Sequence, residues 1–74
     1  MDIRIDKASK VPVYLQIADQ IKSQIISGAL PRASALPSER ALAQLLDVHR
    51  NTVVKAYSEL KSDAWIESRQ GVGY

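Results

Sequence analysis

The feature that most constrains this fold is a very short joint between two apolar stripes of helical spacing. Both stripes contain the i, i+3, i+4 pattern of a buried helix face, and they are Leu42, Leu45 and Leu46, then Val53, Ala56, Tyr57 and Leu60. Only Val48 and His49 separate the first predicted helix, which should end near Asp47, from the second, which should run to about Asp63. Helices joined by so few residues must cross at a steep angle.

A longer helix is predicted upstream, from Pro12 to Ser27. Its apolar residues recur every four positions with two flanking ones, and they are Val13, Ile17, Ile21 and Ile25, flanked by Ala18 and Ile26. Gly28 follows where helices often end on a left-handed residue. Before this helix, residues 1–11 form a polar arm in which Ile3 and Ile5 alternate, which indicates a loop or a short strand packed on one side.

Two of the three prolines lie in the connector between these helices, Ala29 to Pro37. Proline disfavours helix at its own position and at the residue before it. Ser38 then stands at a favourable N-cap position, and Glu39 places a carboxylate in the positive first turn that follows. The middle helix is therefore predicted to begin directly after Ser38.

The last residues predict a small β-hairpin after the third helix. Trp65 and Ile66 open a strand-like alternation at about residue 65, and Gln70 to Gly73 is typical of a tight turn into a returning strand, cut short at Tyr74. Three helices with such a hairpin form a winged helix-turn-helix, a fold that is mainly α with a small β-hairpin. We expect a single domain over residues 1–74.

Three aromatic side chains are predicted to belong to the core. Tyr57 completes the apolar stripe of the third helix, and Trp65 would close over the helices from the first strand of the hairpin. Tyr14 belongs to the first helix and is most simply a core residue as well. The alternative is that these rings stack on RNA bases.

Length and composition exclude several classes of protein. A domain of 74 residues has a marginal core and no room for a deep pocket. The absence of cysteine excludes disulfides and thiolate metal sites. No apolar run approaches membrane-spanning length, and the N-terminus has no hydrophobic signal core, so we expect a soluble, cytoplasmic protein. The net charge of +2 is too small to indicate a nucleic-acid partner by itself.

Catalysis is not expected from this sequence. Its single histidine, His49, lies near Asp47 and several serines, but no glycine-flanked nucleophile accompanies them. One histidine and scattered carboxylates also lack the spacing of a metal site. We therefore predict no catalytic residue, no metal and no cofactor.

Polar side chains at the start of the third helix are the candidate base readers. In a helix-turn-helix, the second helix of the pair lies in the DNA major groove and contacts base edges from its first turn. Arg50 suits guanine, Asn51 suits adenine, and the methyl group of Thr52 suits thymine. The alternative is an ordinary solvated helix start.

Five further residues are candidate contacts elsewhere on DNA. Arg40, Lys55 and Arg69 would neutralise phosphates, and Ser38 offers a hydroxyl at a helix start. Gly71 either lets the wing approach the minor groove or only supplies the positive φ of a hairpin turn. For each cation, the alternative is an exposed charge without a partner.

The order of these motifs resembles the winged-helix DNA-binding domain of GntR-type bacterial transcription regulators. The resemblance runs from about Val11 to the end of the sequence and rests on the segments PVYLQIADQIKSQIISGAL, LPSER, VHRNTVVKAY and IESRQGVG. Within the family, the NTVV and AY residues are most similar to the YtrA and MocR types. The resemblance implies sequence-specific binding of double-stranded operator DNA by a transcription regulator such as a repressor.

Members of this family carry a C-terminal effector and dimerisation region, so the resemblance implies partners and ligands outside this chain. We expect the full-length regulator to be a homodimer on a pseudo-palindromic operator, and these 74 residues to be largely monomeric. Any effector ligand would bind elsewhere, and a MocR-type protein would add a domain that binds pyridoxal phosphate. The alternative function is a winged-helix module for protein–protein interaction.

Several residues depart from the family pattern. Ala33 replaces a glycine, and Ala35 stands where a basic residue usually meets a phosphate, a contact that Arg32 could replace. His49 replaces the serine that caps the third helix, and imidazole is a poorer cap than a hydroxyl. Asp47 replaces a glycine at the turn, where aspartate tolerates a left-handed backbone better than most residues.

Overall fold

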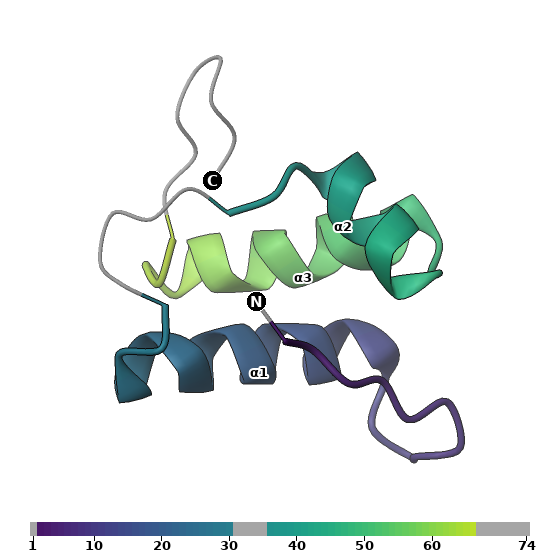
Figure 1. The fold of residues 1–74 in the computed structure, drawn as a ribbon, viewed down its shortest axis with the longest axis horizontal. Helices are drawn as coiled ribbons and strands as arrows, with labels where there is room; N and C mark the ends of the chain where they lie inside the picture. The colour runs from purple at the N-terminus through teal and green to yellow at the C-terminus, as the bar shows by residue number, and fades with distance from the viewer. Residues whose placement is uncertain (1, 31–35, 67–74) are drawn as a thin grey trace.

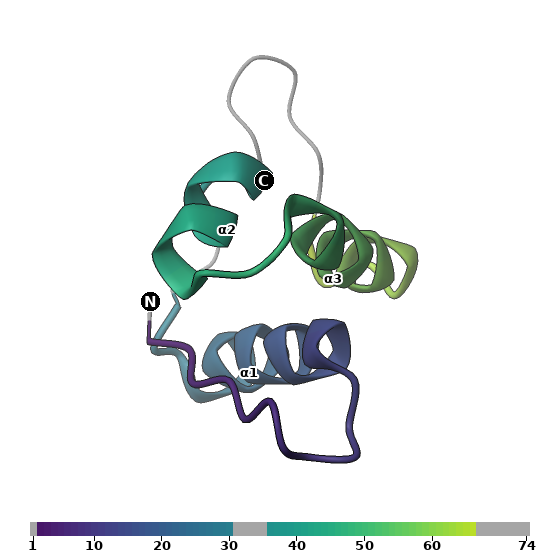
Figure 2. The ribbon, with the colours of Figure 1, turned by 90° about the vertical axis from the view of Figure 1, so that its right-hand side faces the viewer.

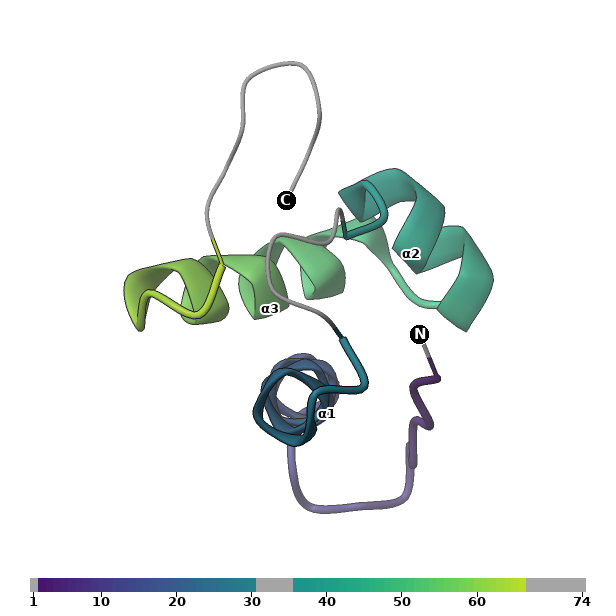
Figure 3. The same cartoon turned by 60° about the vertical axis from the view of Figure 1, so that its left-hand side comes forward.

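A computed structural model describes residues 2–30 and 36–66. Three helices form the described part of the chain: α1 (Val13–Ser27), α2 (Glu39–Leu46) and α3 (Arg50–Ser62). Helix α3 packs against both α1 and α2 (Figure 1). Figure 2 looks nearly along α3 and shows α2 lying across that direction, which is the steep crossing that the short joint predicted. Figure 3 looks along α1, with α3 passing across the view.

The helix ends lie where the local sequence predicted them. Pro12 precedes α1, and Gly28 ends it in the left-handed region at φ 83°, with open space where a Cβ would stand, so backbone conformation alone favours glycine there. Ser38 caps α2 by accepting a hydrogen bond from the backbone N–H of Ala41 at 3.1 Å. His49 caps α3 through Nδ1, which accepts from the N–H of Asn51 at 3.2 Å.

The joint between α2 and α3 depends on Asp47, which adopts a left-handed backbone with φ 54°. The N–H of the next residue, Val48, donates to the carbonyl of Ala43 at 3.0 Å and closes the end of α2. The expectation that aspartate would keep this turn is therefore confirmed. Two residues then suffice to reach the first turn of α3.

Among residues 2–30 and 36–66, the core is formed by ten buried apolar side chains from the three helices and the connector. They are Ile17, Ala18, Ile21, Leu36, Leu42, Ala43, Val53, Ala56, Tyr57 and Leu60. Tyr57 is fully buried and donates its hydroxyl to the carbonyl of Pro37 at 2.7 Å, which ties the connector to α3. Tyr14 and Trp65 are only half-buried and pack at the edge of this core.

One apolar residue assigned to a buried stripe is exposed instead. Leu45 is 68% exposed, so its assignment to the buried stripe was wrong; Ile26, which flanks the stripe of α1, is 66% exposed. The reason in α2 is that, among the described helices, its eight residues pack against α3 and not against α1, and the face that they bury includes Ala43, which is 6% exposed. A helix with one neighbour buries a narrow face, and Leu45 lies outside it.

The N-terminal arm lies antiparallel to α1 (Figure 1). Glutamine side chains of that helix bind the arm's backbone. Gln20 accepts from the N–H of Arg4 at 2.8 Å and donates to the carbonyl of the same residue at 2.6 Å. Gln16 does the same at Asp6, at 2.8 and 2.9 Å. Ile3 and Ile5 pack against the core, so the predicted one-sided packing is confirmed, although no strand forms in residues 2–11.

The end of α3 differs from the predicted start of a strand. Ala64 adopts a left-handed backbone at φ 62°, and the N–H of Trp65 donates to the carbonyl of Leu60 at 2.9 Å. Trp65 and Ile66 form a bend, so the strand predicted from about residue 65 does not begin there. The rest of the predicted wing, residues 67–74, lies outside the described residues.

Candidate nucleic-acid interface

The first turn of α3 presents its polar side chains to solvent. Arg50 and Asn51 are both exposed, and Arg50 leaves 60% of its side chain accessible. The N-terminal N–H groups of a helix carry a partial positive charge, so this end of α3 attracts anions in addition to the Arg50 cation. The structure therefore brings hydrogen-bond donors and positive charge to one exposed helix end.

Arg50 faces a carboxylate from the preceding helix. Its Nη2 lies 4.0 Å from Oε1 of Glu39, the first residue of α2. The Glu39 side chain is 22% exposed and therefore more restricted than its partner. Such a pair contributes little to stability at the surface, and it places a negative charge beside the guanidinium at the start of α3. The sequence indicated only that the Glu39 carboxylate favours the positive first turn of α2, because nothing local joins Glu39 to Arg50.

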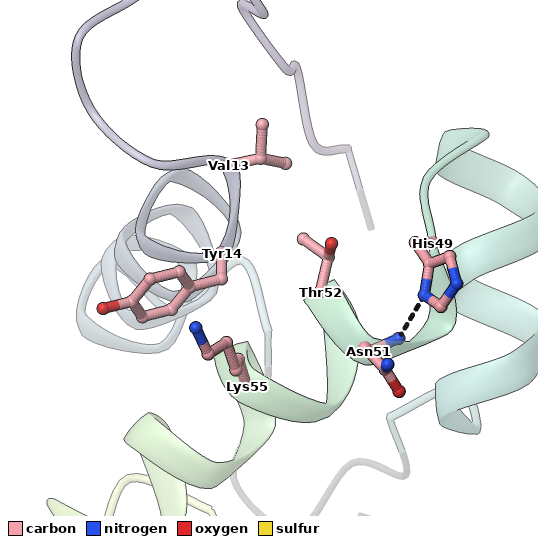
Figure 4. Close-up of a pocket in the computed structure, with 6 residues that line it drawn as sticks. All are labelled: Val13, Tyr14, His49, Asn51, Thr52 and Lys55. Atoms are coloured by element: carbon pink, nitrogen blue, oxygen red, sulfur yellow. Dashed lines mark hydrogen bonds between the residues drawn. The ribbon is translucent and has the colours of Figure 1, made fainter.

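An open groove separates the starts of α1 and α3, and Figure 4 shows the side chains that line it. They are Val13, Tyr14, His49, Asn51, Thr52 and Lys55. Thr52 is half-buried and points towards the start of α1, whereas Asn51 points away from it (Figure 4). Two of the three predicted base readers, Asn51 and Thr52, thus line the groove, whereas Arg50 does not.

Lys55 lies at the side of the groove, where α1 restrains it. Its Nζ is 5.1 Å from the centroid of the Tyr14 ring, a cation–π distance. The lysine remains exposed, so its charge is available to a ligand. The Tyr14 contact could not be read from the sequence, because it joins residues far apart along the chain.

The other predicted DNA contacts are distributed more widely. Ser38 and Arg40 are exposed at the start of α2, where the Ser38 oxygen already accepts the capping hydrogen bond. Arg69 and Gly71, like Arg32 and Ala35 in the connector, lie outside the described residues. Within residues 2–30 and 36–66, no three His, Asp or Glu side chains gather as a metal site. No helix of this part is long and apolar enough to cross a bilayer.

Comparison with known proteins matches the chain to a family and to solved structures. The model of the GntR family of bacterial regulatory proteins matches residues 13–74. The chain is 41% identical over 71 residues to the transcriptional repressor YtrA of Bacillus subtilis, covering 96% of this chain and 55% of that protein. It spans only 14% of a MocR regulator from Rhizobium meliloti, to which it is 35% identical. These relatives extend well beyond the matched segment.

Two solved structures have the same fold. One is YtrA from Sulfolobus acidocaldarius, a GntR-family transcription factor. Its superposition covers 92% of this chain and 72% of the YtrA chain, with a TM-score of 0.90 and 46% sequence identity. The DNA-binding domain of AraR was solved in complex with operator ORX1. Its superposition covers 99% of this chain and 92% of the AraR chain, with a TM-score of 0.82 and 29% sequence identity. The predicted winged helix-turn-helix class is thereby confirmed. The chain belongs to the GntR family of bacterial regulatory proteins and has the fold of their DNA-binding domain.

Proposed function

We propose that this chain is the operator-reading domain of a transcription regulator, a single cytoplasmic domain that inserts α3 into the major groove of double-stranded DNA. The observation that carries the proposal is the exposed first turn of α3, where Arg50 and Asn51 stand beside the Lys55 cation. An α-helix fits the major groove, and these side chains match base edges and phosphates. The AraR domain, bound to its operator, supports this arrangement in a chain of the same fold.

Base recognition is assigned to the exposed side chains of the first turn. Arg50 would donate two hydrogen bonds to the O6 and N7 acceptors of a guanine, and Asn51 would pair with an adenine. The Glu39 carboxylate, 4.0 Å from the guanidinium, is proposed to favour one orientation of Arg50 and so to reduce the rotamer freedom lost on binding. Thr52, which faces the groove towards α1, is proposed to contact the adjoining backbone or a thymine methyl group.

Backbone recognition is assigned to cations and hydroxyls around that turn. Lys55, held over the Tyr14 ring, would meet a phosphate at one side of α3, and Arg40 would do so from α2. The Ser38 hydroxyl can donate its proton to a phosphate while its oxygen keeps the capping bond. Arg69 and Gly71 are proposed to contact DNA from the wing.

The assembled regulator is proposed to be a homodimer that places two copies of α3 on a pseudo-palindromic site. The chain spans about half the length of its YtrA relative, so dimerisation and effector binding are assigned to residues outside it. A MocR-type protein would carry a pyridoxal-phosphate-binding domain there. The 74 residues alone should sediment largely as monomers and bind one half-site weakly.

A protein–protein interaction module is the second candidate for this fold, since fold alone does not determine function. Such a module would be expected to present an apolar patch at the start of α3. The exposed residues of that turn are instead Arg50 and Asn51. Their polarity and charge favour DNA as the partner.

Titration of labelled duplex DNA by fluorescence anisotropy at several salt concentrations tests the proposal. Affinity should fall steeply with salt, and Lys55→Ala should reduce the slope of log K against log salt by about 0.9. Lys22→Ala is the matched control. Lys22 belongs to α1 and also contacts an aromatic ring, since its Nζ lies 5.2 Å from the centroid of the Trp65 ring. It should leave the slope unchanged. Absence of duplex binding at low salt would reject DNA recognition in favour of the interaction module.

A further inference from the structure

Val54 is the one large apolar side chain exposed on α3. It is 37% exposed, and the remaining exposed residues of this helix are polar or charged: Arg50, Asn51, Lys55, Ser58, Glu59, Lys61 and Ser62. A β-branched side chain loses rotamer freedom in a helix, so helix propensity disfavours valine at this position. Packing covers only part of the side chain, and the remaining 37% is free to contact a ligand.

The position of Val54 relative to the proposed base readers is set by helix geometry. Val54 follows Arg50 by four residues and Asn51 by three, so its side chain neighbours both on the helix surface. Helical side chains lean towards the N-terminus, so the Val54 methyl groups cover the turn that carries these two residues. An apolar group thus adjoins the polar first turn of α3.

A DNA duplex presents one apolar group of matching size in its major groove, the C5-methyl of thymine. Val54 lies about 6 Å along α3 from Arg50, and successive bases are about 3.4 Å apart. We propose that Val54 packs against the C5-methyl group of a thymine one or two base pairs from the base that Arg50 contacts. This inference rests on the proposed function and names the thymine methyl group as one of the features of DNA that the domain recognises.

The experiment begins with selection of duplexes from a random-sequence pool by the 74-residue chain. The selected duplex is then synthesised with each thymine replaced in turn by uracil, which keeps the base-pairing edge and lacks only the methyl group. Replacement at one position per half-site should weaken binding about fourfold, the ratio that corresponds to losing one buried methyl group. The other thymine-to-uracil replacements should have smaller effects.

Variants at position 54 assign the effect to this side chain. Val54→Ala should bind the thymine and uracil duplexes equally at that position, whereas Val54→Ile should keep the preference for thymine. Alanine favours helix, so the exposed substitution keeps the fold, which circular dichroism can verify. Ile26→Ala is the matched control: it removes an exposed aliphatic side chain from α1 and should retain the uracil penalty.

The outcomes distinguish failure of the Val54–thymine contact from failure of DNA recognition as a whole. A selected site without thymine near the Arg50-dependent base would overturn the inference and leave DNA recognition standing. The same conclusion follows if Val54→Ala keeps the parent's response to uracil. A pool from which no duplex is enriched would reject the proposed function itself, and the methyl contact with it.

Discussion

The ammonium nitrogen of Lys55 lies 5.1 Å from the centroid of the Tyr14 ring, which joins α3 to the start of α1 beside the proposed DNA-binding face. The lysine is exposed and the tyrosine is half-buried, so the ring supports the ammonium group from the protein side while leaving it accessible to a ligand. A restrained lysine loses less side-chain freedom when it meets a phosphate. The contact thus links the packing of α1 to the chemistry of α3.

Tyr14→Leu is expected to weaken binding to selected and random duplexes alike. The exposed cation–π contact corresponds to about 0.5–1 kcal/mol, so the loss should be about two- to fivefold. Tyr14→Phe keeps the ring and should bind as the parent does. Anisotropy titrations of the three proteins test this, and equal affinity for all three would show that the ring does not position Lys55.

Arg50→Ala is expected to change sequence preference, whereas Lys55→Ala is expected to change affinity alone. Loss of two hydrogen bonds to a guanine should cost about 1–3 kcal/mol at the selected site and relax preference at one base position per half-site. Competition titrations over single-base variants of the selected duplex provide the comparison. Parallel profiles for the two variants would assign Arg50 to phosphate contact instead of base reading.

Glu39→Gln tests whether the Glu39 carboxylate orients the Arg50 guanidinium for base recognition. The amide keeps the size of the side chain but removes the charge that faces Arg50 at 4.0 Å. If the carboxylate orients the guanidinium, the variant should relax preference at the base position affected by Arg50→Ala, while its salt slope stays that of the parent. An unchanged preference would contradict this role of Glu39.

Truncation of the core should unfold the domain, and truncation of Leu45 should not. Ile21→Ala or Leu60→Ala removes a side chain that is at most 2% exposed and should cost about 2–5 kcal/mol, comparable with the whole stability of so small a domain. Leu45→Ala is the matched control because Leu45 is 68% exposed. Thermal unfolding followed by circular dichroism measures all three, and a near-parental transition in either core variant would refute its assignment.

Ala64→Gly is expected to stabilise the protein. Ala64 adopts φ 62°, a left-handed backbone that costs an ordinary L-residue roughly 1–2 kcal/mol and glycine almost nothing. After allowance for the greater freedom of glycine in the unfolded chain, about 1 kcal/mol should remain. Urea unfolding measures the change. Ala41→Gly, on an exposed position inside α2, is the control and should destabilise by a similar amount.

The helix boundaries were predictable from short stretches of sequence because the interactions that set them are local. Ser38 caps a residue three positions away, and Asp47 and Gly28 end helices through their own backbone conformations. The apolar period identified most of the core for the same reason, since helical spacing places residues on one face before any packing occurs. The candidate base readers Arg50 and Asn51 followed from their position at a helix start.

Contacts between elements were decided by the tertiary structure. Whether Leu45 or Ala43 is buried depends on the orientation in which α2 meets α3. The docking of the arm depends on Gln16 and Gln20, whose contacts with Asp6 and Arg4 span 10 and 16 residues. The same holds for Tyr14 with Lys55 and for Glu39 with Arg50. Side-chain types and their spacing describe one helix at a time, whereas these contacts require the relative placement of two, which the packing of the whole core determines.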